Sequence, residues 1–172
     1  MTSRARHEIW LFRHGETAWT LTGQHTGRTD LPLNNIGRRQ AEALGRALAN
    51  RSFATVLCSP LIRAVETCRL AGYGETARIT DDLKEWDYGA YEGLRLEEIL
   101  EKRPGWTIWN DGAPGGETVE QIAGRLLDQR RACVTRFSMC VPARTGSRSA
   151  TRRRTAFRDL ARRLAFQGPP RA

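Results

Sequence analysis

Two arginines and one histidine could together form a site for an anion. Arg13-His14-Gly15 follows a short apolar run near the N-terminus, and Arg63 comes shortly after Ser59-Pro60. Guanidinium groups bind phosphate oxygens through paired N–H donors, and a neutral imidazole with one free ring nitrogen can attack phosphorus. These residue types indicate a pocket for a tetrahedral dianion with His14 as a candidate nucleophile. A histidine at the end of a strand can equally have a purely structural role.

The elements that would bring these residues together are predicted from the apolar pattern. Residues 9–12 are expected to form a buried strand, and Ser59-Pro60 is expected to open a helix, with Ser59 capping its first free amides and Pro60 at its first position. Ligands bind where strands end and helices begin in open α/β sheets, so both arginines would lie at one edge. Further strands are expected at 55–58 and 78–80, helices at 36–50, 59–71, 96–102 and after a capping box at 118–121, and irregular segments at 23–35, 83–91 and 104–116.

This alternation predicts the fold class. Strands that alternate with helices form βαβ units, which build a mostly parallel sheet covered on both faces. We therefore expect an α/β fold, a three-layer αβα sandwich around a mostly parallel central sheet. Residues expected to face the core are Trp10, Ala41, Leu44, Ala47, Leu48 and Tyr91.

Length and composition are those of a globular domain. The 172 residues amount to one domain, with 40% apolar and 27% charged residues. No apolar run approaches the roughly 18–20 residues of a membrane span, and none resembles a secretory signal. The four cysteines (Cys58, Cys68, Cys133 and Cys140) match no zinc spacing. We expect a cytoplasmic protein with reduced thiols, without a metal and without a membrane partner.

The net charge of +9 is not spread over the chain. Residues 1–124 hold 15 basic and 17 acidic side chains, whereas residues 125–172 hold 13 basic and 2 acidic ones. The first part is therefore slightly acidic, and nucleic acid is not expected as its partner. We divide the chain into a domain at 1–133 and an arginine-rich tail at 134–172.

Four motifs occur in order along the chain. They are Leu11-Phe12-Arg13-His14-Gly15-Glu16-Thr17, Thr26-Gly27-Arg28-Thr29-Asp30-Leu31-Pro32-Leu33, Ser59-Pro60-Leu61-Ile62-Arg63-Ala64-Val65-Glu66-Thr67, and Leu83-Lys84-Glu85-Trp86-Asp87-Tyr88-Gly89-Ala90-Tyr91-Glu92-Gly93. Taken together, these motifs resemble the histidine phosphatase superfamily, the phosphoglycerate-mutase-like group, over residues 9 to about 132. The segments 106–112 and 116–118 strengthen the resemblance to a short sugar-phosphatase branch of the family, similar to fungal sedoheptulose bisphosphatase.

The resemblance implies a role for each site residue. His14 takes the phosphoryl group as phosphohistidine, and Arg13 and Arg63 hold the phosphoryl oxygens. Glu85 protonates the leaving alkoxide and then deprotonates water. Because the nearby arginines lower its pKa, burial or the charge of the substrate must offset that effect. The implied substrate is a small phosphorylated metabolite of the sugar-phosphate type, with no cofactor and no metal. The implied substrate-binding residues are Thr20, Thr26, Gly27, Trp86, Asp87 and Tyr88.

Hydrolysis and phosphoryl transfer begin with the same phosphohistidine. Phosphoglycerate mutases of the family carry a lysine at the place that Leu96 occupies here, and a long basic insertion after that segment. Only about two dozen residues separate Gly93 from Glu117, which favours hydrolysis over the mutase alternative.

The C-terminal region departs from the family. The family uses a second histidine near its C-terminus, but the last histidine here is His25, so we expect a catalytic rate lower by about 10²–10³-fold. We hypothesise that a shifted reading frame produced the tail, because the codons of Ala143-Arg144-Thr145-Gly146 permit Ala-His-Gly in the shifted frame. As an alternative, residues 151–166 form a basic amphipathic helix that binds nucleic acid or an anionic membrane beside a non-catalytic phosphate-binding domain.

Overall fold

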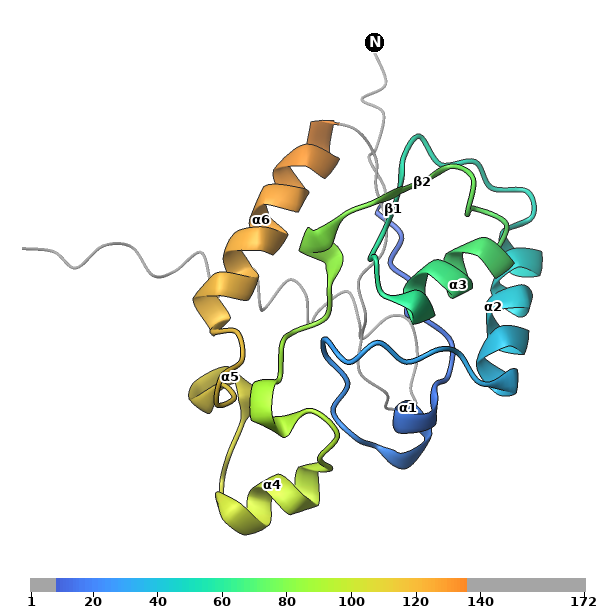
Figure 1. Ribbon diagram of the computed structural model, residues 1–172. Coiled ribbons are helices and arrows are strands. Elements are labelled where there is room, and N and C mark those ends of the chain that lie inside the picture. The colour runs from blue at the N-terminus through green and yellow to red at the C-terminus, as the bar shows by residue number, and fades with distance from the viewer. Residues whose placement is uncertain (1–8, 136–172) are drawn as a thin grey trace, which may run out of the picture.

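The computed structural model describes the backbone of residues 9–135 and the side chains of residues 9–127 (Figure 1). Within these residues, two short strands lie among helices that differ widely in length. The elements are α1 (Ala18–Thr22), α2 (Asn35–Leu48), β1 (Val56–Cys58), α3 (Ile62–Leu70), β2 (Ala77–Ile79), the 3-10 turns η1 (Asp81–Leu83) and η2 (Gly89–Tyr91), α4 (Leu96–Lys102), α5 (Ile108–Asp111) and α6 (Val119–Thr135).

The unit β1–α3–β2 confirms the expected βαβ arrangement. β1 pairs in parallel with β2, with Val56 opposite Ala77, and every residue of β1 is buried. In Figure 1, α2 and α3 lie to one side of the strand pair and α6 lies to the other. The α/β class is therefore confirmed, while the larger three-layer sheet remains a prediction.

The strand expected at residues 9–12 is wrong for the described part of the chain. This segment lies outside any β-ladder there, and Ile9 and Leu11 are 52% and 46% exposed. Trp10 still packs edge-on against Phe53, with ring centroids 6.1 Å apart.

The helix α2 follows its predicted bounds to within two residues. The side chain of Asn34 caps it by accepting a hydrogen bond from the Gly37 amide at 2.8 Å. Its buried residues are Gly37, Ala41 and Leu48, but Ala47, expected in the core, is exposed. Adjacent residues of a helix point about 100° apart around its axis. Ala47 therefore lies outside the buried face of α2 that includes Leu48.

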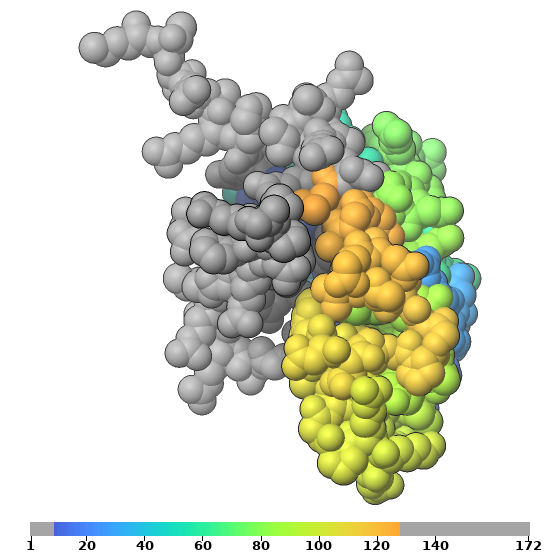
Figure 2. All heavy atoms as spheres, turned by 90° about the vertical axis from the view of Figure 1, so that its left-hand side faces the viewer, coloured from blue at the N-terminus to red at the C-terminus, as the bar shows by residue number. Residues whose placement is uncertain are grey.

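The second half of the domain also follows its sequence signals. α4 has the expected bounds, and the capping box of α6 forms through reciprocal hydrogen bonds between Thr118 and Gln121. The segment expected to be irregular at 104–116 contains the short helix α5, which the Thr107 side chain caps. In the space-filling view α6 and the α4–α5 segment form one continuous face (Figure 2).

Aromatic rings pack this half of the domain. Trp106 is buried and meets Tyr91 edge-on at 5.3 Å, which agrees with a packing role for both residues. Trp109 is 55% exposed and meets Trp86 at 5.4 Å.

The start of α2 packs directly on the turn that carries His14. A Cβ atom on Gly37 would collide with backbone atoms of Glu16, and one on Gly15 would collide with the carbonyl group of Gly37. The two backbones therefore approach closely because both positions are glycine.

We predict that Gly37→Ala lowers the free energy of unfolding by about 1–3 kcal/mol, because the added methyl group forces two backbones apart. Gly124→Ala is the matched control. Gly124 lies within α6 with open space around it, so alanine there should stabilise the protein by about 0.5–1 kcal/mol. Urea unfolding measures both changes, and a Gly37→Ala protein as stable as the parent would contradict the packing described.

Candidate active site

His14 is held in one tautomer by its own turn. Its Nδ1 atom lies 2.7 Å from the carbonyl oxygen of Gly15. A carbonyl oxygen only accepts hydrogen bonds, so Nδ1 carries the proton and Nε2 keeps its lone pair. Burial lowers the pKa of His14 to about 4; the Gly15 carbonyl opposes this shift, while the charges of Arg63 and Arg13 add to it. The ring is therefore neutral at pH 7 and presents a nucleophilic nitrogen.

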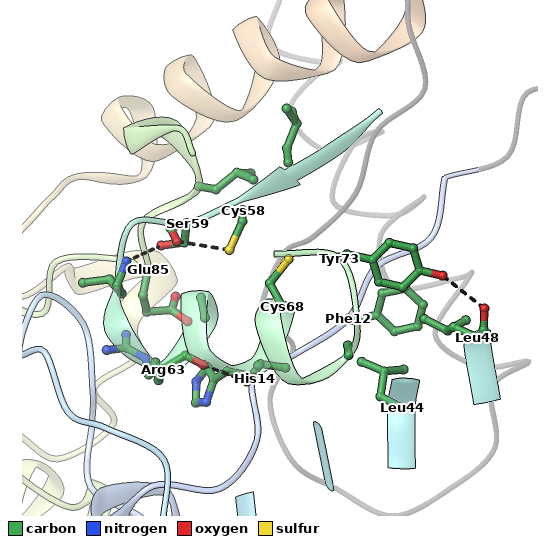
Figure 3. Close-up of a pocket in the computed structure, with 16 residues that line it drawn as sticks. Phe12, His14, Leu44, Leu48, Cys58, Ser59, Arg63, Cys68, Tyr73 and Glu85 are labelled. Carbon is green, nitrogen blue, oxygen red and sulfur yellow. Dashed lines mark hydrogen bonds between the residues drawn. The ribbon is translucent and has the colours of Figure 1, made fainter. Parts of the chain in front are cut away.

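The turn is attached to α3 through Thr67. The amide of Gly15 donates to the hydroxyl of Thr67 at 3.0 Å, and that hydroxyl donates to the carbonyl of Arg63 at 2.7 Å. The helix that carries Arg63 thus also fixes the backbone next to His14. Figure 3 shows His14, Arg63 and Glu85 together at one end of a pocket.

Arg63 is almost completely buried, with an exposure of 1%. Its guanidinium donates to the carbonyls of Gly27 at 2.7 Å and Thr29 at 3.0 Å. A guanidinium has five N–H donors, so these two bonds leave others for an anion. Burial lowers the pKa of Arg63, and the charges of Glu85 and Asp30 oppose that shift.

The helix cap expected at Ser59-Pro60 is wrong. α3 begins at Ile62, and the first amide of the helix donates to the carboxylate of Asp30 at 2.7 Å. Ser59 only accepts a bond of 3.4 Å from the Leu61 amide. A carboxylate at a helix N-terminus is favoured by the helix dipole, so Asp30 occupies the place expected for a bound anion. The cationic side chains, rather than the start of α3, are left to bind phosphate.

Glu85 lies in the same pocket as His14 and Arg63. Its carboxylate accepts a hydrogen bond from the Trp86 amide at 2.9 Å. Burial raises the pKa of Glu85; the Trp86 amide and then the charges of Arg63, Arg13 and Arg125 act against this rise without cancelling it. This is the offset by burial that a general acid beside two arginines requires.

Arg13 is half-buried and close enough to act on its neighbours electrostatically. Its charge lowers the pKa values of both His14 and Glu85. The structure therefore brings all four expected catalytic residues into one neighbourhood, with Arg13 outside the set of residues that line the pocket.

None of the six expected substrate-binding residues is among the described residues that line the pocket, although the carbonyl of Gly27 accepts a hydrogen bond from Arg63. A Cβ on Gly27 would collide with the carbonyl oxygen of Trp86, so the loop that holds Thr26 and Gly27 packs against the segment 86–88. Thr20, Thr26 and Asp87 make local hydrogen bonds, to Thr17, to the carbonyl of Gln24 and to the Gly89 amide. The indole of Trp86 instead donates to the carbonyl of Glu117, 31 positions away, and Tyr88 meets the ring of His25 at 5.0 Å.

Sequence reasoning missed the carboxylate that shapes the loop between α1 and α2. Glu92 accepts hydrogen bonds from the amides of Arg28 and Thr29, at 2.5 and 2.6 Å, and from the Thr29 hydroxyl. These bonds present the carbonyls of residues 27 and 29 to Arg63. Glu92 lies within the motif 83–93, but no spacing rule signals a partner more than sixty residues away.

The pocket continues from the polar end into an apolar cavity. Figure 3 shows Phe12, Leu44, Leu48 and Tyr73 at the far end. Among residues 9–127, no cluster of three or more histidine, cysteine or acidic side chains could hold a metal ion. No helix in the described part is long and apolar enough to cross a membrane.

We predict that the His14 ring titrates at about pH 4 rather than near its ordinary 6.5. Because the folded-state pKa is the lower one, the unfolded protein binds the proton more readily, and stability falls as the pH drops from 6.5 towards 4. Chemical shifts of the imidazole protons measure the pKa, with His14→Gln identifying the signal. A midpoint near 6.5 would contradict the burial described.

Comparison with known proteins extends the likeness to most of the chain. The family description "histidine phosphatase superfamily (branch 1)" matches residues 9–139. An acid phosphatase from Mycobacterium tuberculosis is 45% identical over 121 residues, which are 69% of this chain and 59% of that protein. Sedoheptulose 1,7-bisphosphatase from Saccharomyces cerevisiae is 38% identical over 139 residues, which are 67% of this chain and 51% of that protein. The chain thus spans little more than half the length of these relatives.

Solved structures show the same likeness. A functionally characterised open reading frame from Mycobacterium tuberculosis superposes with a TM-score of 0.73 at 40% identity, covering 79% of this chain and 73% of that one. A mycobacterial glucosyl-3-phosphoglycerate phosphatase, solved with VO3, gives a TM-score of 0.67 at 26% identity, covering 76% and 72%. With its RHG turn and buried Arg63 in the matched region, this chain belongs to the histidine phosphatase superfamily, branch 1.

Proposed function

We propose that this chain is a phosphatase that hydrolyses a small phosphorylated metabolite through a phosphohistidine at His14. The observation that carries the proposal is the Nδ1 hydrogen bond of His14 to the Gly15 carbonyl, inside a pocket shared with Arg63 and Glu85. This arrangement supplies a nucleophile, a cation for the phosphoryl oxygens and a proton donor.

The first half of the reaction forms the phosphoenzyme. The Nε2 lone pair of His14 attacks phosphorus and the bond to the leaving oxygen breaks, while that oxygen takes the proton of Glu85. Arg63 and Arg13 stabilise the charge that spreads over the three equatorial oxygens. The raised pKa of Glu85 keeps a larger fraction of its carboxyl protonated for this step.

The second half releases phosphate. The Glu85 carboxylate takes a proton from water as the water oxygen attacks phosphorus, and the bond to Nε2 breaks. His14 returns to its neutral state, which its lowered pKa favours. Acid and base are then restored to their starting forms.

The names of the relatives support a sugar-phosphate substrate. A sedoheptulose 1,7-bisphosphatase and a glucosyl-3-phosphoglycerate phosphatase both act on phosphorylated sugars or their derivatives. Hydrolysis is favoured over the mutase alternative because Leu96 replaces a lysine and the segment from Gly93 to Glu117 is short. A mutase would pass the phosphoryl group to a second sugar hydroxyl instead of to water.

His25 does not replace the second histidine of the family. It is buried among other rings, with Nδ1 bonded to the Leu94 carbonyl at 2.9 Å and the Trp106 ring at 5.7 Å. Because no histidine follows it in the sequence, we propose that turnover is about 10²–10³-fold below that of a complete site.

The tail and the location of the protein are proposals as well. We propose that the enzyme is cytoplasmic and that its domain ends near residue 133. We also propose that a shifted reading frame produced the arginine-rich tail that follows, most of which lies outside the described residues. The gene's nucleotide sequence across codons 130–150 tests this. Salt-sensitive nucleic-acid binding that deletion of residues 134–172 abolishes would favour the non-catalytic, basic-tail alternative.

We predict that the protein releases phosphate from p-nitrophenyl phosphate and that His14→Ala abolishes this release. Glu85→Gln should lower kcat by about 10²–10⁴-fold on substrates with a poor leaving group, such as sugar phosphates. Glu101→Gln, which alters an exposed carboxyl group on α4, is the control and should match the parent. Phosphate release that persists at the parent's rate in His14→Ala would refute the proposal.

The pH profile of kcat/KM should follow the same two groups. Activity rises as His14 loses its proton at about pH 4 and falls again as the pH passes the raised pKa of Glu85, so the optimum lies between these two pKa values. Initial rates from pH 3 to 9 measure both limbs. An acidic limb centred at the ordinary histidine value of 6.5 would contradict the assignment of His14.

A further inference from the structure

The segment that carries Glu85 has little regular structure and is held from α6. Arg125 donates from Nη1 to the carbonyls of Asp82 at 2.7 Å and Lys84 at 2.6 Å, and from Nη2 to the carbonyl of Glu85 at 3.2 Å. One guanidinium therefore fixes the backbone up to and including Glu85.

Glu117 fixes the backbone on the other side of Glu85. Its carboxylate pairs with both Nε and Nη2 of Arg125 at 2.9 Å and also accepts the Asp87 amide at 2.9 Å. Its main chain accepts the Trp86 indole N–H at 2.9 Å and donates to the Asp87 carbonyl at 3.0 Å. Residues 82–87 are thus bonded on both sides of the candidate acid.

This pair differs from an ordinary surface ion pair. The side chains of Arg125 and Glu117 are only 13% and 16% exposed, and the guanidinium of Arg28 lies 3.1 Å from the Glu117 carboxylate. Burial raises the pKa of Glu117, but Arg125, the Asp87 amide and Arg28 together leave it below its ordinary value. The carboxylate is therefore ionised at neutral pH, where it can keep its bidentate pairing with Arg125.

We propose that Arg125 and Glu117 are positioning residues that hold the Glu85 carboxyl group at the reacting oxygen. Neither lines the pocket, so both act through Glu85 and not on the substrate. The inference rests on the phosphatase reaction proposed above. With the backbone fixed on both sides, only the side-chain torsions of Glu85 remain to be set, and a displacement of about 1 Å can cost about 10² in rate.

The most direct test separates the guanidinium geometry from its charge. Arg125→Lys keeps the charge but cannot bond three carbonyls and a carboxylate together. We expect kcat on a sugar phosphate to fall by about 10–10²-fold with KM changed less than about twofold. Arg103→Lys is the matched control, since Arg103 also pairs with an acidic residue eight positions away, Asp111, but on an exposed surface; it should match the parent.

A double-mutant cycle shows whether the effect passes through Glu85. In a Glu85→Gln background, adding Arg125→Lys should cause no further loss of kcat, because the group being positioned is already gone. A merely structural role would make the two losses multiply. Removing the charge with Arg125→Gln should also move the alkaline limb of the pH profile upwards, because the Arg125 charge lowers the pKa of Glu85.

Hydrogen exchange gives a readout that does not need turnover. Peptides covering residues 82–89 should exchange at least about tenfold faster in Arg125→Lys than in the parent or in Arg103→Lys. An active parent whose Arg125→Lys variant matches it in kcat and in exchange would overturn the positioning role alone. A parent that releases no phosphate while the exchange difference persists would instead overturn the proposed function.

Discussion

The hydrogen bond between His14 Nδ1 and the Gly15 carbonyl is the constraint on which the rest of the site depends. A neutral imidazole has one donor and one acceptor, so a carbonyl at Nδ1 leaves the nucleophilic lone pair at Nε2. Burial and two neighbouring guanidiniums keep the ring unprotonated. The backbone beside it is fixed in turn by Thr67 and by the close approach of α2 at Gly37. Several weak local features together determine which nitrogen can react.

Charge in this domain is organised by carboxylates that bond backbone amides. Asp30 caps α3, and Glu92 shapes the loop whose carbonyls bind Arg63. Glu117 bonds both Arg125 and the backbone of the segment 82–87 that carries Glu85. Each of these carboxylates partly offsets the charge of a buried arginine. Burying an unpaired cation in a low-dielectric interior would cost free energy. Arg63 can therefore lie almost fully buried beside His14 while retaining donors for a phosphoryl group.

The sequence predicted the parts of the structure that depend on local patterns. The helix α4, the capping box of α6 and the strand at Val56–Cys58 follow from residue spacing, and the resemblance placed His14, Arg63 and Glu85 in one pocket. No strand is assigned at residues 9–12 within the described part of the chain, although the apolar run predicted one.

Contacts between distant segments were beyond sequence reasoning. The cap of α3 comes from Asp30, a residue 32 positions earlier, in place of the adjacent Ser59. The hydrogen bonds from Arg125 to the segment that carries Glu85 span about forty residues and use backbone carbonyls, which every residue carries. Side-chain type therefore gave no signal for these partners, whereas the structure shows them directly.

Covalent capture of the phosphoryl group tests the central claim most directly. The protein would be mixed with a sugar phosphate, quenched in alkali within milliseconds, digested and analysed by mass spectrometry. We expect one added phosphoryl group on the peptide that contains His14, attached at Nε2. A phosphoryl group at Nδ1 or on another residue, or phosphate release by the parent protein without any phosphorylated peptide, would contradict it.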